Sequence, residues 1–239
     1  MRIQPFLLMI SLAATLVIFP QQVLAITNAQ AGRLALEAFK GDASSLRQLQ
    51  HAAQTREAIP EYWLGAYFEG KKQNREAEHW WREAANQGYA AAEYGLGSLY
   101  DLGHGVVQDH TMAIRWWRKA AAQGFSPAER NLAIAYGRGE GVLQDYATAV
   151  QWWRKAADQR DGVAEYSLAY CYSHGYGVAH DYVTAVQWYI LVKTDEAPGS
   201  VIYQQADQNL RFTENRMTQE EVQQGYAQAE QILQRRHSQ

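Results

Sequence analysis

The chain has 239 residues, of which 47% are hydrophobic and 12% aromatic, and its formal net charge is −3. This hydrophobic content is too high for a disordered chain. The weakly acidic balance argues against nucleic-acid binding, because proteins that bind nucleic acids normally present a basic surface to the phosphates. Cys171 is the only cysteine, so no internal disulfide can form and the fold must depend on its core.

Residues 1–25 have the pattern of a secretory signal peptide. Arg2 gives a positive start, residues 6–19 are uncharged and apolar, and residues 23–25 offer small side chains to a signal peptidase. A membrane anchor is the alternative, although a bilayer span needs about 20 apolar residues and this run is shorter. We expect cleavage before Ile26, export to the periplasm or secretion, and no stable membrane insertion after cleavage.

A repeat of 36 residues is the strongest pattern in the chain. Trp-Trp-Arg occurs at residues 80–82, 116–118 and 152–154, and Trp188-Tyr189 continues the series. Other residue types recur with the same spacing: Leu96, Leu132 and Leu168; Tyr100, Tyr136 and Tyr172; Gly105, Gly141 and Gly177; Asp109, Asp145 and Asp181. Repeats of this kind stack on one another, since a single unit cannot bury its apolar face alone.

Each unit is predicted to contain two helices. Apolar residues within 92–103 fall on one helical face, and Gly103 is suited to end that helix. Asp109 is predicted to cap the second helix, in which Trp117 shares a face with small alanines. Alternating β-branched segments are absent. The sequence therefore predicts an all-α fold, a right-handed α/α superhelical solenoid of 36-residue helix–turn–helix repeats.

The repeat and its irregular ends divide the chain into seven segments. We expect a signal peptide at 1–25, an N-terminal helical cap at 26–59, a degenerate repeat at 60–88, repeats at 89–124, 125–160 and 161–196, and C-terminal capping helices at 197–239. In the last segment, Thr218 and Glu221 are predicted to form a capping box. The helix that follows is expected to pack through a face that carries Val222, Tyr226, Ala229 and Leu233.

The pattern Ala-Glu-Tyr-x-Leu-Gly-x-x-Tyr-x-x-Gly-x-Gly-Val-x-x-Asp-x-x-x-Ala-x-x-Trp-Trp-Arg-Lys-Ala-Ala-x-Gln-Gly is clearest at residues 92–124. It resembles the Sel-one-like repeat (SLR) family, whose members are related to tetratricopeptide repeats. The resemblance covers roughly residues 60–193 and implies a bacterial adaptor or scaffold, often exported, that binds other proteins through its curved surface. Some cysteine-rich members are described as binding or acting on penicillin-like ligands, but they carry a disulfide in each repeat. The resemblance therefore does not extend that activity to this chain.

Several residues of types that are common in catalytic, phosphate-binding or metal sites are expected to have structural roles in this chain. Glu93, Glu129 and Glu165 are expected to cap helices from their third position, with Ser126 opening a capping box. The Gly-x-Gly loops are expected to be turns between helices rather than phosphate loops. The seven histidines lack the spacing of a zinc site, and Cys171 occupies a core-facing position. We therefore expect no catalytic site, cofactor or metal.

A partner is expected on the concave side of the solenoid, which the first helix of each unit usually lines. Residues about 180° from the core face of these helices differ between units and include tyrosine and arginine, which are favoured at binding hot spots. The candidate binding residues are Tyr94, Ser98, Asp101, Arg130, Ile134, Tyr166, Tyr170 and Ser173. The predicted function is a periplasmic or secreted scaffold that binds a protein or peptide. A cell-wall-related enzyme or ligand receptor is the alternative, and the oligomeric state stays open.

Overall fold

The computed structural model describes residues 26–238, and every regular element in that range is a helix. The predicted signal peptide lies outside the described residues. The first six helices are α1 (Asn28–Phe39), α2 (Ala43–Ala53), α3 (Ala58–Gly70), α4 (Asn74–Asn86), α5 (Ala90–Leu102) and α6 (His110–Ala122). The next six are α7 (Ser126–Arg138), α8 (Tyr146–Asp158), α9 (Gly162–His174), α10 (Tyr182–Asp195), α11 (Val201–Glu214) and α12 (Gln219–His237). The predicted all-α solenoid is confirmed.

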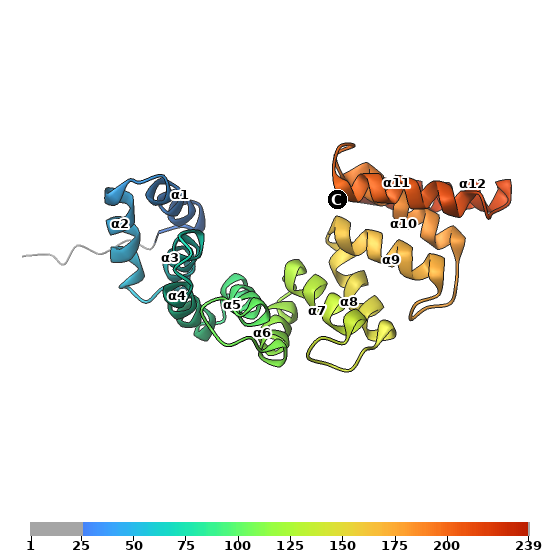
Figure 1. Ribbon diagram of the computed structural model, residues 1–239. Coiled ribbons are helices and arrows are strands. Elements are labelled where there is room, and N and C mark those ends of the chain that lie inside the picture. The colour runs from blue at the N-terminus through green and yellow to red at the C-terminus, as the bar shows by residue number, and fades with distance from the viewer. Residues whose placement is uncertain (1–25, 239) are drawn as a thin grey trace, which may run out of the picture.

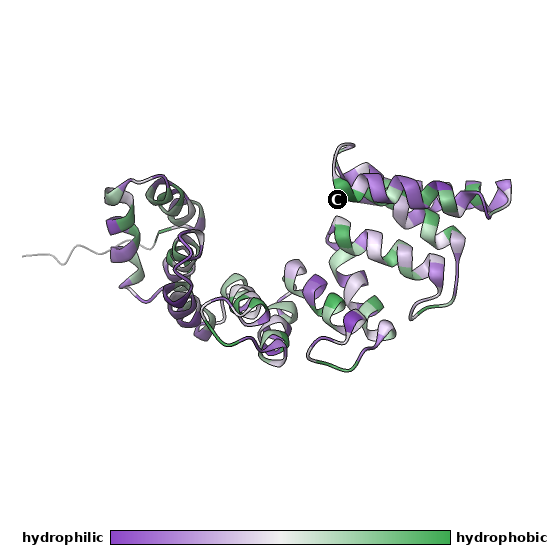
Figure 2. Cartoon of the chain, in the orientation of Figure 1, coloured by the Kyte–Doolittle hydropathy of each residue, from purple (hydrophilic) through white to green (hydrophobic). Residues whose placement is uncertain are grey.

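Helices α1 to α11 pack in chain order, each on the next; α1 also packs on α3, and α12 packs on α10. Figure 1 shows the resulting open arc, with α1 to α4 at one end, α5 to α8 at the bend and α9 to α12 at the other end. Hydrophobic and hydrophilic residues alternate around the individual helices (Figure 2), as expected for helices that bury one face. In the part of the chain that the structure describes, no helix combines the length and hydrophobicity of a membrane span.

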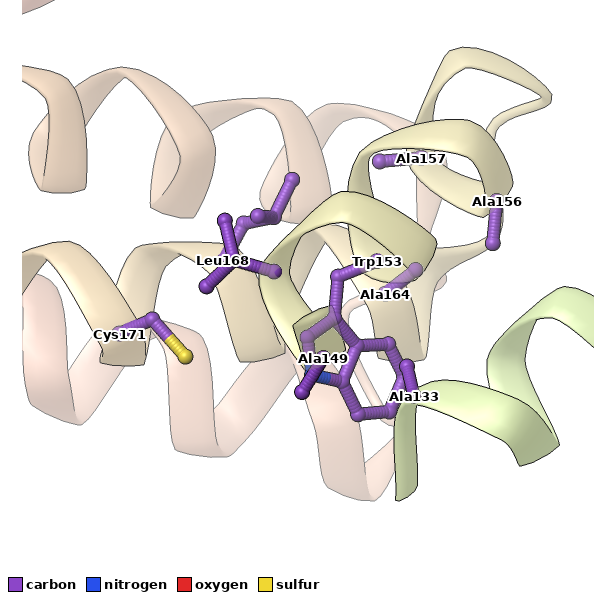
Figure 3. Packing of buried hydrophobic residues seen from close by; sticks show 9 residues of the cluster. Ala133, Ala149, Trp153, Ala156, Ala157, Ala164, Leu168 and Cys171 are labelled. Atoms are coloured by element: carbon purple, nitrogen blue, oxygen red, sulfur yellow. The ribbon is translucent and has the colours of Figure 1, made fainter. Parts of the chain in front are cut away.

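Tryptophan and alanine form the core of the repeats, with Tyr189 in place of the buried tryptophan in the last one. Trp153 is 7% exposed, and its indole ring lies against Ala133 and Ala149 (Figure 3). Trp117 occupies the equivalent place one repeat earlier and is 4% exposed. A Cβ atom at Gly97 would lie 2.3 Å from Nε1 of Trp117, so glycine permits this close approach of ring and helix. The predicted packing role of the tryptophans is confirmed.

Buried glutamates connect the two helices of a repeat, and their predicted capping role is wrong. Helix α7 has Phe125 as its N-cap residue with no side-chain cap, so Glu129 is the fourth helical residue rather than the third. Its Oε2 instead accepts a hydrogen bond of 2.8 Å from Nε2 of Gln159. Gln123 donates to Glu93 in the same way, and Gln87 donates to Glu61. This ladder of carboxylates and amides therefore joins the start of each repeat to the end of the second helix in the same repeat.

The C-terminal helix completes the ladder. Asp195 stands where the repeat would place a fourth glutamine, and Arg236 of α12 supplies the missing donor. Its guanidinium donates to Glu165 and to Asp195, each at 2.6 Å. The capping box of Thr218 and Glu221 is confirmed.

The packing face of α12 matches the predicted one in part. Ala229 is buried and Val222 and Leu233 are half-buried, whereas Tyr226 is 47% exposed and donates to Glu214. Gly225 is buried although it was not predicted to be. A Cβ atom at Gly225 would lie 2.7 Å from Cγ1 of Val186, so the helix axis comes close to α10 only because position 225 is a glycine.

Candidate functional site

A cavity of about 630 Å³ lies where α7, α8, α9 and α11 meet. Helix α7 contributes Ile134, and α8 contributes Trp153 at the floor. Helix α9 contributes Tyr166 and Tyr170, and α11 closes one side with Ile202. We call this the main cavity. Its walls are largely apolar and aromatic, which is typical of sites that bind a ligand through buried hydrophobic surface.

Tyrosines form the exposed rim of the main cavity. Tyr146, Tyr170 and Tyr176 are 39%, 39% and 40% exposed. The rings of Tyr146 and Tyr176 stack with centroids 5.1 Å apart, and Tyr170 stacks on His174 at 4.0 Å. These contacts restrict the rings before any ligand arrives, so a ligand that packs on them loses less side-chain entropy.

Two smaller hollows adjoin the main cavity. One, of about 140 Å³, shares Ile134 and Arg138 with it and reaches Asp101 of α5. The other, of about 320 Å³, shares Tyr170 with it and reaches Ser173 and α11. The three hollows follow one another along the first helices of successive repeats, α5, α7 and α9. We call this series the hollow row.

Five of the eight predicted binding residues line the hollow row. Ile134, Tyr166 and Tyr170 line the main cavity, while Asp101 and Ser173 line the neighbouring hollows. Their part in binding stays a prediction. Ser173 differs from the expectation of an exposed position, because it is only 9% exposed and its hydroxyl donates to the carbonyl oxygen of Tyr170 at 3.0 Å.

The other three predicted residues make contacts within the fold. Tyr94 packs against Phe125, with ring centroids 5.5 Å apart. Ser98 donates its hydroxyl to the Tyr94 carbonyl oxygen at 3.2 Å. Arg130 forms an ion pair of 2.8 Å with Asp161, the N-cap residue of α9. A substitution at Tyr94 or Arg130 would therefore disturb packing or capping as well as any binding surface.

Several lining residues were not predicted from sequence. Tyr146 and Tyr176 border the loops between helices, and the prediction considered only first helices. The repeat equivalents of Tyr176 are His104 and Glu140, and those of Tyr146 are His110 and Tyr182. The variation at the place of Tyr176 was the available signal. Ile202 and Gln205 could not be found, because the sequence does not determine how α11 lies against α9.

The main cavity holds no reactive thiolate. Cys171 lines it but is 6% exposed, which confirms its core-facing position, and burial raises the pKa of its thiol to about 11. The thiol is therefore protonated at neutral pH and a poor nucleophile. Burial also raises the pKa of Tyr166, whose hydroxyl accepts a hydrogen bond from Asn209 at 2.9 Å. Among residues 26–238, no three histidine, cysteine or acidic side chains are grouped to hold a metal ion.

The repeats match a known family. The Sel1 repeat pattern matches residues 61–89, 90–125, 126–161 and 162–191, which together make up more than half of the chain. The chain belongs to the Sel1 repeat family. Sel1 repeat proteins are generally protein-interaction scaffolds, and their fold is not typically enzymatic. No curated protein matches the chain significantly.

Solved structures of Sel1 repeat proteins resemble this chain over most of its length. A Sel1 repeat protein from Oxalobacter formigenes is 28% identical, with a TM-score of 0.65 over 76% of this chain and 74% of that one. A protective antigen of uropathogenic Escherichia coli with an SLR fold is 26% identical, with a TM-score of 0.52. This chain is 87% covered in that comparison but spans only 53% of the antigen. A Sel1 repeat protein from Klebsiella pneumoniae, 17% identical with a TM-score of 0.50 over 78% of this chain and 92% of that one, shares the fold.

Proposed function

We propose that this Sel1 repeat protein is an exported scaffold that binds a protein or peptide partner along the hollow row, with the main cavity as the principal contact. The hollow row carries this proposal. Because its three hollows share Ile134, Arg138 and Tyr170, an extended segment of a partner can contact all of them in succession. Tyrosine and arginine are also the residue types that most often dominate binding energy at protein interfaces.

Export is supported by the sequence of residues 1–25, with its positive start, apolar run and small residues before Ile26. We expect the full-length protein, produced in a bacterial host, to appear in the periplasmic fraction or the medium. Mass spectrometry of that material should show Ile26 as the first residue. Retention of residues 1–25 on a membrane-bound product would contradict cleavage.

Photo-crosslinking tests the binding surface. A photoreactive phenylalanine analogue replaces Tyr176 at the rim of the main cavity, and in a control it replaces Gln151, an exposed residue of α8 that lies outside the hollow row. We expect defined crosslinked products from position 176 and few from position 151. The additional substitution Ile134→Asp, which puts a charge into the cavity wall, should abolish the products from position 176.

Crosslinks of equal yield from both positions, or products that survive Ile134→Asp, would contradict binding in the hollow row. Circular dichroism and thermal unfolding of the Ile134→Asp protein are needed as a folding control, since Ile134 also packs against the core of α8 and α9.

The size of the main cavity favours one alternative function, a receptor or enzyme for a small ligand such as cell-wall material. About 630 Å³ falls within the range of about 300–1,000 Å³ that is common for small-molecule sites. Turnover of a wall-derived substrate by the purified protein, lost in Ile134→Asp, would support this alternative over the scaffold.

A further inference from the structure

The charge of the main cavity is one-sided. Arg138 is the only charged residue among those that line it, and no carboxylate lies in its wall. The hollow that shares Tyr170 also has no acidic residue and adds only His174 as a titratable cation. Acidic residues appear only beyond Arg138, where Asp101 and Glu140 line the smallest hollow. The lining of the main cavity itself therefore carries one positive charge and no negative one, while Glu140 and Asp101 lie next to Arg138 in the adjoining hollow.

Arg138 is free to turn toward a ligand. It lies in the last turn of α7, its side chain is 66% exposed, and Nη1 is 3.8 Å from Oε1 of Glu140, beyond hydrogen-bond distance. Within residues 26–238 its guanidinium makes no other ion pair. A planar guanidinium with unused donors is suited to bind a carboxylate through two parallel hydrogen bonds.

The rest of the cavity is suited to an apolar body. Trp153, Val163 and Ile202 offer hydrophobic surface, while the rim tyrosines offer aromatic faces. A peptide side chain such as phenylalanine, tyrosine or leucine fits the same surface at little polar cost.

Continuity of the three hollows favours a peptide over a free small molecule. The main cavity shares Ile134 and Arg138 with one hollow and Tyr170 with the other. A chain molecule can lie along all three hollows while one side chain occupies the main cavity.

We infer that the partner segment is an acidic peptide, which places a large apolar side chain in the main cavity and a carboxylate against Arg138. This inference rests on the proposed function, because it names the chemistry of the partner at the same surface. Specificity then has two independent parts. The apolar side chain sets the affinity, and the carboxylate selects acidic over basic segments.

Three labelled peptides of equal length test the charge preference by fluorescence anisotropy with the full mature protein. Each has one central phenylalanine in a glycine–serine background, flanked by glutamates, glutamines or lysines. We expect the glutamate peptide to bind about 3- to 5-fold tighter than the glutamine peptide, as for a solvent-accessible ion pair, and the lysine peptide to bind most weakly. Replacing phenylalanine by serine should weaken all three peptides by about 10-fold or more.

Two variants assign the preference to one residue. Arg138→Gln should make the glutamate and glutamine peptides bind equally, and Arg138→Glu should reverse the order so that the lysine peptide binds best. Arg115→Gln removes the same charge from an exposed position of α6 outside the hollow row, and we expect it to leave the order unchanged.

The outcomes separate this inference from the proposed function. If all phenylalanine peptides bind equally, or if Arg138→Glu leaves the order unchanged, the acidic-peptide inference is wrong while binding in the hollow row stands. If no peptide binds at up to about 1 mM, the inference is also overturned. The proposed function is tested separately, by the specific crosslinks from position 176 and by their loss in Ile134→Asp.

Discussion

Buried glutamates give the repeats an unusual response to pH. Burial raises the pKa of Glu61 and of Glu165 to about 7, from an ordinary value of 4.5. Burial also raises the pKa of Glu93 and Glu129. The folded chain therefore holds protons that the unfolded chain releases. The resulting contribution to stability is complete below pH 4.5 and is lost as the pH rises toward 7.

Stability should therefore fall between about pH 5 and about pH 8, in contrast to proteins whose carboxylates are ion-paired. Carboxylates with a lowered pKa, such as Asp207 beside Lys193, have the opposite effect on stability. Their contribution is lost only as the pH falls toward and below the ordinary pKa of 3.8. We expect the urea midpoint to be higher at about pH 5 than at about pH 8, and this difference to be smaller in Glu61→Gln. The exposed control Glu220→Gln should keep the full difference. If Glu61→Gln also kept it, a titrating role for Glu61 would be contradicted.

Trp117 is the second residue whose role is open to direct measurement. It is 4% exposed and fills the space between α5, α6 and α7 beside small alanines. Trp117→Ala should lower the free energy of unfolding by about 3–5 kcal/mol through lost burial and a cavity. Gln151→Ala, on the exposed side of α8, should change it by no more than about 0.5 kcal/mol. Similar urea midpoints for the two variants would show that the indole is not a packing element.

At the scale of elements, α12 is attached to the solenoid through Arg236. Glu165 is fully buried, and its ion pair with Arg236 replaces the glutamine contact of the other repeats. Arg236→Ala removes the only positive charge paired with this carboxylate among the described residues. Because the raised pKa lets Glu165 take up a proton, the carboxyl need not remain as an unpaired charge, and we expect a loss of about 1–3 kcal/mol from the missing hydrogen-bond donor.

Arg236→Gln should cost less than Arg236→Ala, because an amide can donate to Glu165 as Gln159 donates to Glu129. Hydrogen exchange should show faster opening of α12 in the alanine variant and little change in α5. The neighbouring control Arg235→Ala should behave as the unmodified protein. If Arg236→Ala exchanged as slowly as that control, Arg236 would not hold α12 in place.

Local patterns were sufficient to predict most helices. Helices α1 and α2 fall within the predicted N-terminal helical cap, and Gly103 ends α5 with a φ of 69° as a left-handed C-cap. The glutamate ladder was missed because Glu129 and Gln159 meet across 30 residues, and Ser126 offered a local capping alternative. The recurrence of Gln87, Gln123 and Gln159 at the repeat spacing was the signal that pointed to it.

The candidate site was less predictable than the fold. Helical periodicity placed Ile134, Tyr166 and Tyr170 on one side of their helices, and the structure brings them together in the main cavity. Periodicity could not place α11, which closes that cavity, because its contact with α9 depends on tertiary packing between residues such as Tyr166 and Asn209.

At the scale of the whole molecule, the core and the hollow row meet at the tryptophans. The second helices α6 and α8 supply Trp117 and Trp153, which belong to the core and also line hollows, whereas the first helices α5, α7 and α9 supply further lining residues. The core tryptophans repeat from unit to unit, while the lining residues of the first helices differ. A partner therefore meets a surface that is specific to this chain on a scaffold shared by the family.

Hydrogen exchange of the mature protein, with and without the partner captured from position 176, tests most directly whether the hollow row is the binding surface. We expect slower exchange in residues 133–138 of α7 and 163–176 of α9 and its loop, with unchanged exchange in α1 to α4. Protection confined to α1 to α4, or to the exposed sides of α6 and α8, would contradict binding in the hollow row.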